Sequence, residues 1–186
     1  MLKARTFIQQ GPFGQAVDAL AAAERIAASG CGHSGIACRH FAHSMCCIER
    51  PARFISPSEA LHGASGFLKA NDVMILASRG GQTSELLPLI PLCRKKGIIM
   101  IGVTENETAP IAVDTHIFIK MHVERESDPC NTQGTSSFLV LCAIFDALQV
   151  ALLEETGFSN ERFALIHPGG AVGERLNRQA RMGNEP

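Results

Sequence analysis

Short apolar runs alternate with longer segments of helical periodicity along this chain. The run 73–77 is apolar at every position, and the run 98–103 is nearly so. Strands that are apolar on both faces are typical of parallel sheets covered by helices on both sides. The alternation therefore predicts an α/β fold, a doubly wound three-layer sandwich. The expected strands are 25–28, 53–55, 73–77, 98–103 and 115–120.

Three segments between and after these runs are expected to be helical: 34–47, 83–96 and about 134–156. The second ends in a cationic turn followed by Gly97, which is a common helix stop. Pro91 within it is expected to kink the helix or loosen its start. The third is apolar almost all round, which predicts a helix buried between layers. The polar tail after about residue 176 is expected to fray.

The length of 186 residues fits a single domain, with a core at about 25–176 and a short N-terminal helical arm. A net charge of −1 and the absence of Trp and Tyr argue against a nucleic-acid-binding protein. The seven cysteines are odd in number and lack Cys-x-x-Cys spacing, so we expect reduced thiols. No apolar stretch suits a signal peptide or a membrane span. The sequence therefore predicts a cytoplasmic protein that binds neither nucleic acid nor membrane.

The segment 78–85 is the most informative stretch, because it joins an apolar strand directly to an expected helix. Ligands of open parallel sheets bind beyond the carboxyl ends of the strands. Glycines such as Gly81 let the backbone approach a ligand, and a helix N-terminus offers N–H groups that suit a phosphate. Ser78 and Thr83 add hydroxyl groups, and Arg79 could pair with a dianion. The alternative is that Thr83 merely caps the helix.

A second glycine-rich turn has the spacing of the dinucleotide-binding fingerprint, with Gly30, Gly32 and Gly35 between a strand and a helix. That fingerprint needs an acidic residue at the end of the second strand. Glu49 precedes that strand, which ends in Ser56. A nicotinamide cofactor is therefore poorly supported, and no cofactor is expected.

The histidines need to be weighed separately. His40, His43 and Cys47 could share a helix face and hold a metal, but no further ligand stands at matching spacing. A partly exposed histidine pair beside a buried thiol is the simpler interpretation, and no metal site is expected. Loops beside glycines more often carry function, and three histidines lie there: His33, His62 and His167.

Together these motifs resemble the sugar isomerase (SIS) domain family, most closely the arabinose 5-phosphate isomerases and the related isomerases of capsule and sugar-alcohol operons. The resemblance extends from about Arg25 to Leu176 and is carried by 30–35, 57–63, 78–85, 135–137, 146–153 and 167–173. It implies a flavodoxin-like, Rossmann-like αβα sandwich with a five-stranded parallel sheet. It also implies homodimers or homotetramers, the latter as dimers of dimers, that share active sites.

The resemblance further implies a pocket for a sugar phosphate. The acids and bases that it places in this pocket are His33, Glu85, Glu126, His62 and His167. The groups expected around the phosphate, including those of the loop itself, are Ser34, Ser78, Arg79, Gly81, Thr83, Thr135 and Ser136. His167 is implied to reach the site of a neighbouring subunit.

The chain also departs from the family pattern. His33 stands where a lysine is usual, Arg79 and Gly80 replace an asparagine and a serine, Gln82 replaces a glutamate, and Ala64 replaces a common aspartate. The paired regulatory (CBS) domains that often follow are absent from the sequence. These departures leave phosphate binding in place and put the particular substrate in question.

The leading hypothesis is an aldose–ketose isomerase acting on a sugar phosphate, of the arabinose 5-phosphate/ribulose 5-phosphate type. The reaction needs a base for the proton alpha to the carbonyl, and Glu126 or His167 is expected to transfer it. His33 and Glu85 would polarise or orient the sugar oxygens, and His62 would assist ring opening or hold a hydroxyl group. The alternative is a non-catalytic sugar-phosphate-binding or sensor domain.

Overall fold

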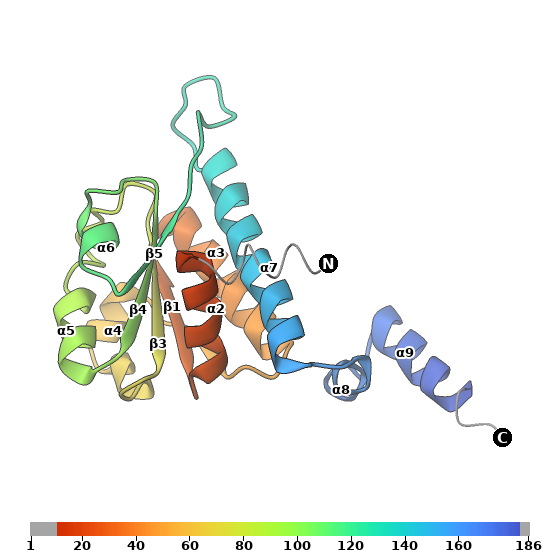
Figure 1. Ribbon diagram of the computed structural model, residues 1–186. Coiled ribbons are helices and arrows are strands. Elements are labelled where there is room, and N and C mark those ends of the chain that lie inside the picture. Colours follow the sequence, from red (N-terminus) through yellow and green to blue (C-terminus); the bar gives the residue numbers. More distant parts are fainter. Residues whose placement is uncertain (1–10, 183–186) are drawn as a thin grey trace.

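Five parallel strands form one sheet between two layers of helices in the computed structural model, which describes residues 11–182 (Figure 1). The strands are β1 (Ile26–Gly30), β2 (Ala52–Phe54), β3 (Val73–Ala77), β4 (Ile99–Thr104) and β5 (Ile117–Lys120). Their order in the sheet is β2-β1-β3-β4-β5, and each neighbouring pair is parallel. The predicted α/β sandwich with a five-stranded parallel sheet is confirmed.

The register of the sheet places the site. β3 is buried at every position, as its apolar sequence predicts, and it pairs with β1 on one side and β4 on the other. Gly30, the last residue of β1, lies opposite Ala77, the last residue of β3. The strand order reverses between these two strands, and such a switch point is where open α/β sheets form a ligand crevice.

The helices divide between the two faces of the sheet (Figure 1). One layer consists of α2 (Pro12–Ala22), α3 (Gly32–Cys46) and α7 (Ser136–Thr156). The other consists of α4 (Pro57–Leu61), the 3₁₀ turn η1 (Ala64–Phe67), α5 (Leu89–Lys96) and α6 (Pro110–Val113). Within the first layer Phe41 of α3 meets Phe145 of α7, with ring centroids 4.8 Å apart. Both rings are fully buried, so this contact ties the two helices together.

Two further helices, α8 (Asn160–Ile166) and α9 (Ala171–Met182), extend away from the sheet beyond the end of α7 (Figure 1). They pack on each other so closely that a Cβ added at Gly173 would lie 1.7 Å from the His167 carbonyl oxygen. The polar tail that is expected to fray after about residue 176 is helical in the structure as far as Met182, where α9 ends. Glu174 in its first turn complements the helix dipole. Part of the expected N-terminal arm falls outside the described residues, and α2 is the part that is described.

The helix expected over 83–96 is shorter than predicted. Residues 83–88 form turns, and α5 begins only at Leu89, with Pro88 as its N-cap. A proline is tolerated in the first turn of a helix but not in its interior. A helix beginning at Thr83 would have held both Pro88 and Pro91 in its interior, so the chain turns first and becomes helical afterwards.

The expectation that α7 is buried between layers is also wrong. Its buried apolar residues form one face, made of Leu141, Phe145, Leu148 and Leu152. On the other side the side chains of Leu139 and Val150 are 65% and 57% exposed. Among the described residues α7 is the helix whose length and apolarity would allow a membrane crossing, yet its buried face packs with α2 and α3. A single chain therefore leaves one apolar face of α7 uncovered.

Candidate functional site

Three segments meet at the carboxyl edge of the sheet: 31–34 after β1, 78–84 after β3, and 121–135 after β5. The first two flank the switch point between β1 and β3. The third projects beyond the sheet before it enters α7, as the teal loop in Figure 1 shows. These segments carry most of the residues that the sequence assigned to the pocket.

The turn from β1 into α3 is tight because two glycines touch. A Cβ at Gly35 would lie 2.6 Å from the carbonyl oxygen of Gly30. Cys31, the N-cap of α3, makes no side-chain capping bond, so the first N–H groups of the helix have no side-chain cap. Ser34 lies half-buried in this first turn. The turn thus offers a hydroxyl group and helix N–H groups next to the switch point.

His33, in the same turn, lies against the beginning of α7. Its ring is 6.1 Å from the ring of Phe138 in an edge-on arrangement. A Cβ at Gly134 would come within 3.1 Å of the imidazole, so the histidine packs directly over that glycine. The structure therefore joins His33 to the segment that precedes α7, which the sequence alone does not predict.

The loop 78–84 is held by its own polar groups. The hydroxyls of Ser78 and Thr83 lie 2.8 Å apart, and the Gly81 N–H donates to the Ser78 hydroxyl at 3.1 Å. Gly81 has φ +68°, and a Cβ there would lie 2.5 Å from the Cβ of Ala109 and 2.7 Å from the Thr104 hydroxyl. The backbone path of the loop therefore requires glycine at this position.

Several backbone N–H groups of this loop have no protein acceptor. Within residues 11–182, no hydrogen bond is donated by the N–H groups of Gly80, Gln82, Thr83 and Ser84. Successive free N–H groups in a turn form a concave anion site. This arrangement can bind a phosphate even though α5 begins several residues later than expected.

The guanidinium of Arg79 is directed to two carboxylates. Its Nε donates to Glu105 at 2.9 Å, and its Nη1 donates to Glu126 at 2.7 Å. The side chain of Arg79 is 36% exposed, whereas that of Glu126 is 2% exposed. The sequence predicted Arg79 for a ligand dianion and did not predict this double ion pair.

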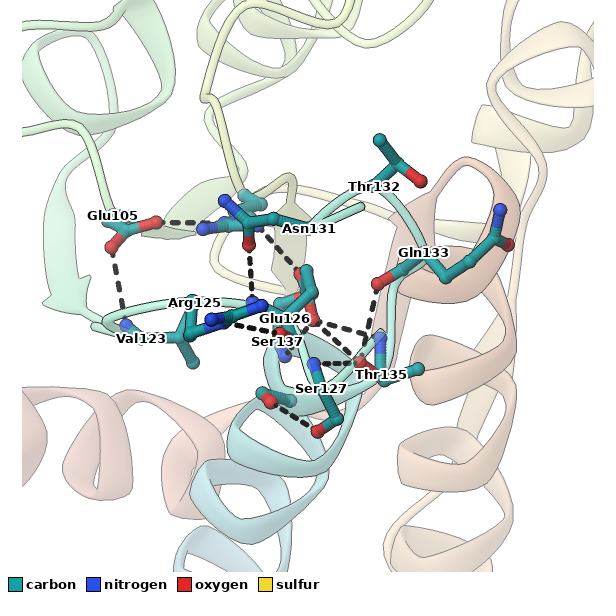
Figure 2. A network of polar contacts seen from close by, with 12 residues as sticks. Glu105, Val123, Arg125, Glu126, Ser127, Asn131, Thr132, Gln133, Thr135 and Ser137 are labelled. Carbon is teal, nitrogen blue, oxygen red and sulfur yellow. Dashed lines mark hydrogen bonds and ion pairs between the residues drawn. The ribbon is translucent and has the colours of Figure 1, made fainter. Parts of the chain in front are cut away.

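Glu126 accepts hydrogen bonds at the N-terminus of α7 (Figure 2). Its Oε2 accepts from the N–H groups of Thr135 and Ser137 at 2.9 and 3.0 Å, and from the Thr135 hydroxyl at 3.2 Å. Burial raises the pKa of this carboxyl, but the hydrogen bonds from Ser137 and Thr135 outweigh it and hold the pKa at about 2. Glu126 is therefore an ionised cap of α7 and a weak base at neutral pH.

We expect Glu126 to make the folded chain sensitive to acid. Its pKa is depressed in the folded state, so its contribution to the free energy of unfolding is present above the unfolded value of about 4.3. That contribution is lost as the pH falls toward 2. In Glu126→Gln, Tm measured from pH 5 to pH 2.5 should fall less steeply than in the wild type. Parallel Tm profiles for the two proteins would contradict this assignment.

The rest of the 126–136 segment is also internally bonded. Asp128 accepts from the N–H groups of Gln133 and Thr132, which lower the pKa of its carboxyl. Figure 2 shows Ser127 beside Thr135, whose hydroxyl accepts from the Ser127 N–H at 2.8 Å. The Ser136 hydroxyl lies 2.9 Å from that of Ser127. The hydroxyls of Thr135 and Ser136 are thus held in place within this segment.

Two predicted pocket residues are exposed on the chain surface. Glu85 follows the loop, and its own N–H and the hydroxyl of Ser84 lower the pKa of its carboxyl. His62 is the exposed C-cap of α4, ahead of Gly63 with φ +110°. Within the described chain no hydrogen bond joins His62 to the loops around the switch point.

His167 lies far from the loops of its own chain. It ends α8 and stacks on Phe163 with ring centroids 3.9 Å apart. The segment 121–135 leads into the N-terminus of α7, whereas α8 follows the C-terminus of the same helix. The 21 residues of α7 span about 30 Å. Figure 1 shows the same separation. The structure therefore does not bring His167 to the other predicted pocket residues of the same chain.

The histidines weighed as metal ligands have other partners. His40 Nε2 lies 2.8 Å from Asp146 of α7, and His43 Nε2 lies 3.6 Å from the Cys47 sulfur. Among residues 11–182 no group of three or more His, Cys, Asp or Glu side chains is placed to hold a metal ion.

Two polar residues at the carboxyl end of β4, Thr104 and Glu105, were missed by sequence reasoning. Thr104 donates to the Arg79 carbonyl oxygen at 2.8 Å, and Glu105 binds the Arg79 side chain. Glu105 also lies 3.1 Å from His122. Their position at the carboxyl end of a central strand was the available signal, since polar groups gather at that edge in parallel sheets.

Comparison with known proteins gives the family. The model of the SIS domain family matches residues 19–151. An arabinose 5-phosphate isomerase of Pseudomonas aeruginosa is 38% identical over 84% of this chain and 48% of its own length. The arabinose 5-phosphate isomerase GutQ of Escherichia coli is 36% identical over 82% of this chain and 47% of its own length. The chain spans about half the length of these curated relatives.

Solved structures agree. A Listeria monocytogenes protein described as a candidate sugar-phosphate isomerase is 44% identical and superposes with a TM-score of 0.82, covering 85% of this chain and 83% of its own. An Escherichia coli CFT073 protein solved in complex with arabinose 5-phosphate is 28% identical, with a TM-score of 0.79 over 90% of this chain and 91% of its own. The family match covers most of the chain, and the relatives agree with it in both sequence and fold. The chain therefore belongs to the SIS domain family.

Proposed function

We propose that this protein is a phosphosugar isomerase that interconverts an aldose and a ketose phosphate, of the arabinose 5-phosphate/ribulose 5-phosphate type. The curated relatives with 35–38% identity are named arabinose 5-phosphate isomerases. The structural relative solved in complex with arabinose 5-phosphate matches this chain over 90% of its length and 91% of its own. We also propose a single SIS domain that works in the cytoplasm, where free thiols such as its seven cysteines persist.

The observation that carries the proposal is the set of free N–H groups in the loop 80–84 at the switch point of the sheet. These groups, with the Gly81 turn, would receive the phosphate. The hydroxyls of Ser34 and Thr83 lie on the two flanking segments and would add donors. The hydroxyls of Ser78, Thr135 and Ser136 already hold the loops in place, and we assign them mainly to shaping the pocket.

The isomerisation needs one base and one acid. The base removes a proton from the carbon next to the carbonyl, and the proton returns to the adjoining carbon after an enediolate forms. Glu126 suits this task poorly, because its hydrogen bonds hold the pKa of its carboxyl at about 2. We therefore assign proton transfer to His167 of a second copy, and the orientation of sugar oxygens to His33 and Glu85. His62 is assigned to ring opening.

A second copy follows from two features of the chain. α7 leaves an apolar face uncovered, with Leu139 and Val150 exposed. His167 lies on an arm that is about 30 Å of helix away from its own loops. A homodimer, or a homotetramer built as a dimer of dimers, would cover the apolar face of α7 and bring His167 to the site of a neighbouring subunit.

Incubation with arabinose 5-phosphate should produce ribulose 5-phosphate, followed by proton NMR in D₂O. Solvent deuterium should enter the carbon that exchanges its proton, because the base exchanges with water. Pentose, hexose and heptose phosphates tested side by side would identify the preferred sugar. Absence of turnover with all of them would rule out the isomerase.

The alternative is a sugar-phosphate-binding domain without turnover. His33 favours it, because a histidine packed against Phe138 stands where the family usually has lysine. In this case a sugar phosphate at about 100 times its Kd would stabilise the fold by about 2.7 kcal/mol without any product. Thermal melts and NMR on the same samples separate the two functions.

A further inference from the structure

Arg79 stands between two carboxylates that hold opposite ends of the segment 123–135. Two hydrogen bonds hold the backbone of Arg79, because its carbonyl oxygen accepts from the Thr104 hydroxyl at 2.8 Å and from the Glu105 N–H at 3.0 Å. The side chain then reaches Glu105 through Nε and Glu126 through Nη1. A planar guanidinium holds two such partners at fixed angles.

Each carboxylate uses its other oxygen to hold backbone. Oε1 of Glu105 accepts from the Val123 N–H at 3.2 Å, where the chain leaves β5. Oε2 of Glu126 accepts from the N–H groups of Thr135 and Ser137, where the chain enters α7. Figure 2 shows the two carboxylates with these partners on either side. Arg79 therefore connects the entry and the exit of the segment through one guanidinium.

The local charges disfavour Arg79 as a phosphate ligand. One guanidinium already faces two carboxylates, so a dianion approaching it would also approach both of them. Within residues 11–182, neither of these two carboxylates accepts a hydrogen bond from the N–H groups of the loop 80–84, whereas Glu85, which follows the loop, accepts from the Ser84 hydroxyl at 2.9 Å. The anion site and the ion-pair site thus use different groups of the same loop.

We propose that Arg79 is a positioning residue, which fixes the segment 123–135 against the loop 78–84 by bridging Glu105 and Glu126, and that the phosphate is bound without it. The proposal rests on the proposed function only in assigning the loop 78–84 to the substrate. The bridge itself is a property of the free protein and can be tested without turnover.

The test compares Arg79→Met and Arg79→Lys with the wild type by hydrogen exchange and calorimetry. Arg79→Met keeps the length of the side chain and removes its donors. Amide exchange over 123–135 should become about tenfold faster or more, because the carboxylate anchors lose their common partner. The Kd for inorganic phosphate should stay within about twofold of the wild type, whereas a lost charged ligand would weaken it about tenfold or more.

Arg79→Lys keeps the charge and should recover part of the protection, with one of the two carboxylates paired. This rescue separates positioning from a general loss of folding. The matched control is Arg53→Met, which removes an exposed guanidinium stacked on Phe67 and should leave both measurements unchanged.

Two results would overturn the proposal. One is unchanged exchange over 123–135 in Arg79→Met. The other is a phosphate Kd weakened about tenfold or more, which would make Arg79 a ligand. A wild type that binds neither phosphate nor sugar phosphate would contradict the proposed function instead, and the exchange data would still decide on the bridge.

Discussion

Replacing His167 with alanine is expected to lower kcat by about 10²–10⁴-fold, the usual contribution of a positioned acid or base. Binding of inorganic phosphate should change little, because we assign the phosphate to the N–H groups of the loop 80–84 and not to His167. The measurement is turnover by NMR together with a phosphate Kd by calorimetry. His43→Ala, which removes an exposed histidine of α3, is the matched control and should retain activity.

Mixing two inactive variants distinguishes a shared site from a site within one chain. His167→Ala and Glu85→Ala should each be inactive alone. After unfolding and refolding together, about a quarter of the wild-type activity should return if each site of a dimer takes His167 from one copy and Glu85 from the other. No recovery, with mixed dimers confirmed by mass spectrometry, would place both residues in the same chain's site.

The oligomer can be tested through the uncovered face of α7. Leu139 and Val150 are exposed in a single chain, so arginine at both positions should cost the chain itself little. The same change should disrupt the association and, with it, the activity restored by mixing. Light scattering gives the mass of each variant, and a monomeric wild type would remove the reason to place His167 in a second copy's site.

Replacing Gly81 with alanine is expected to distort the loop that we assign to phosphate. The added Cβ would lie 2.5 Å from Ala109 and 2.7 Å from Thr104, and the backbone has φ +68°. Overpacking and a left-handed backbone together cost about 2–4 kcal/mol. This corresponds to a fall in Tm of about 5–15 °C for a chain of this size, and phosphate binding should be lost as well.

Gly80→Ala is the matched control one residue away. No atom lies within 4 Å of a Cβ built there, and its φ is not positive. We expect a change in stability within about 0.5 kcal/mol. If the two variants had equal Tm and equal phosphate affinity, the tight contact of Gly81 with Thr104 and Ala109 would not control the loop.

The parts of the fold that local sequence determines were predictable. The run 73–77 is apolar at each position and forms the central strand β3. A strand buried on both faces is apolar throughout, so it can be identified from its own residues without knowing which strands pair with it. The helix expected from Thr83 begins only at Leu89 for a local reason: Pro91 predicts a loosened start, and Pro88 moves the start of the helix beyond itself. The prediction that α7 is buried between layers was wrong for a different reason. A helix that is apolar on all sides can be covered by its own chain or by another chain, and the sequence does not distinguish the two.

The loops of the site were predictable as loops, because polar groups after buried strands gather at one edge of a parallel sheet. The partners within the site were not. Arg79 bonds to Glu105 and Glu126, which are 26 and 47 residues away in sequence. Which way a guanidinium turns among several candidate anions depends on backbone positions that only the folded chain fixes. The resemblance to the family predicts that Arg79 lies in the loop. It does not predict which groups the Arg79 side chain contacts.

The double ion pair of Arg79 also affects how a ligand would reach the site. A guanidinium flanked by two carboxylates leaves no net positive charge in that cluster, and the free donors of the loop are uncharged amides. Long-range steering needs a net potential that extends over a Debye length, about 8 Å at physiological salt. A metabolite phosphate would therefore be recognised on contact rather than drawn in from a distance, and its rate of capture would depend only weakly on ionic strength.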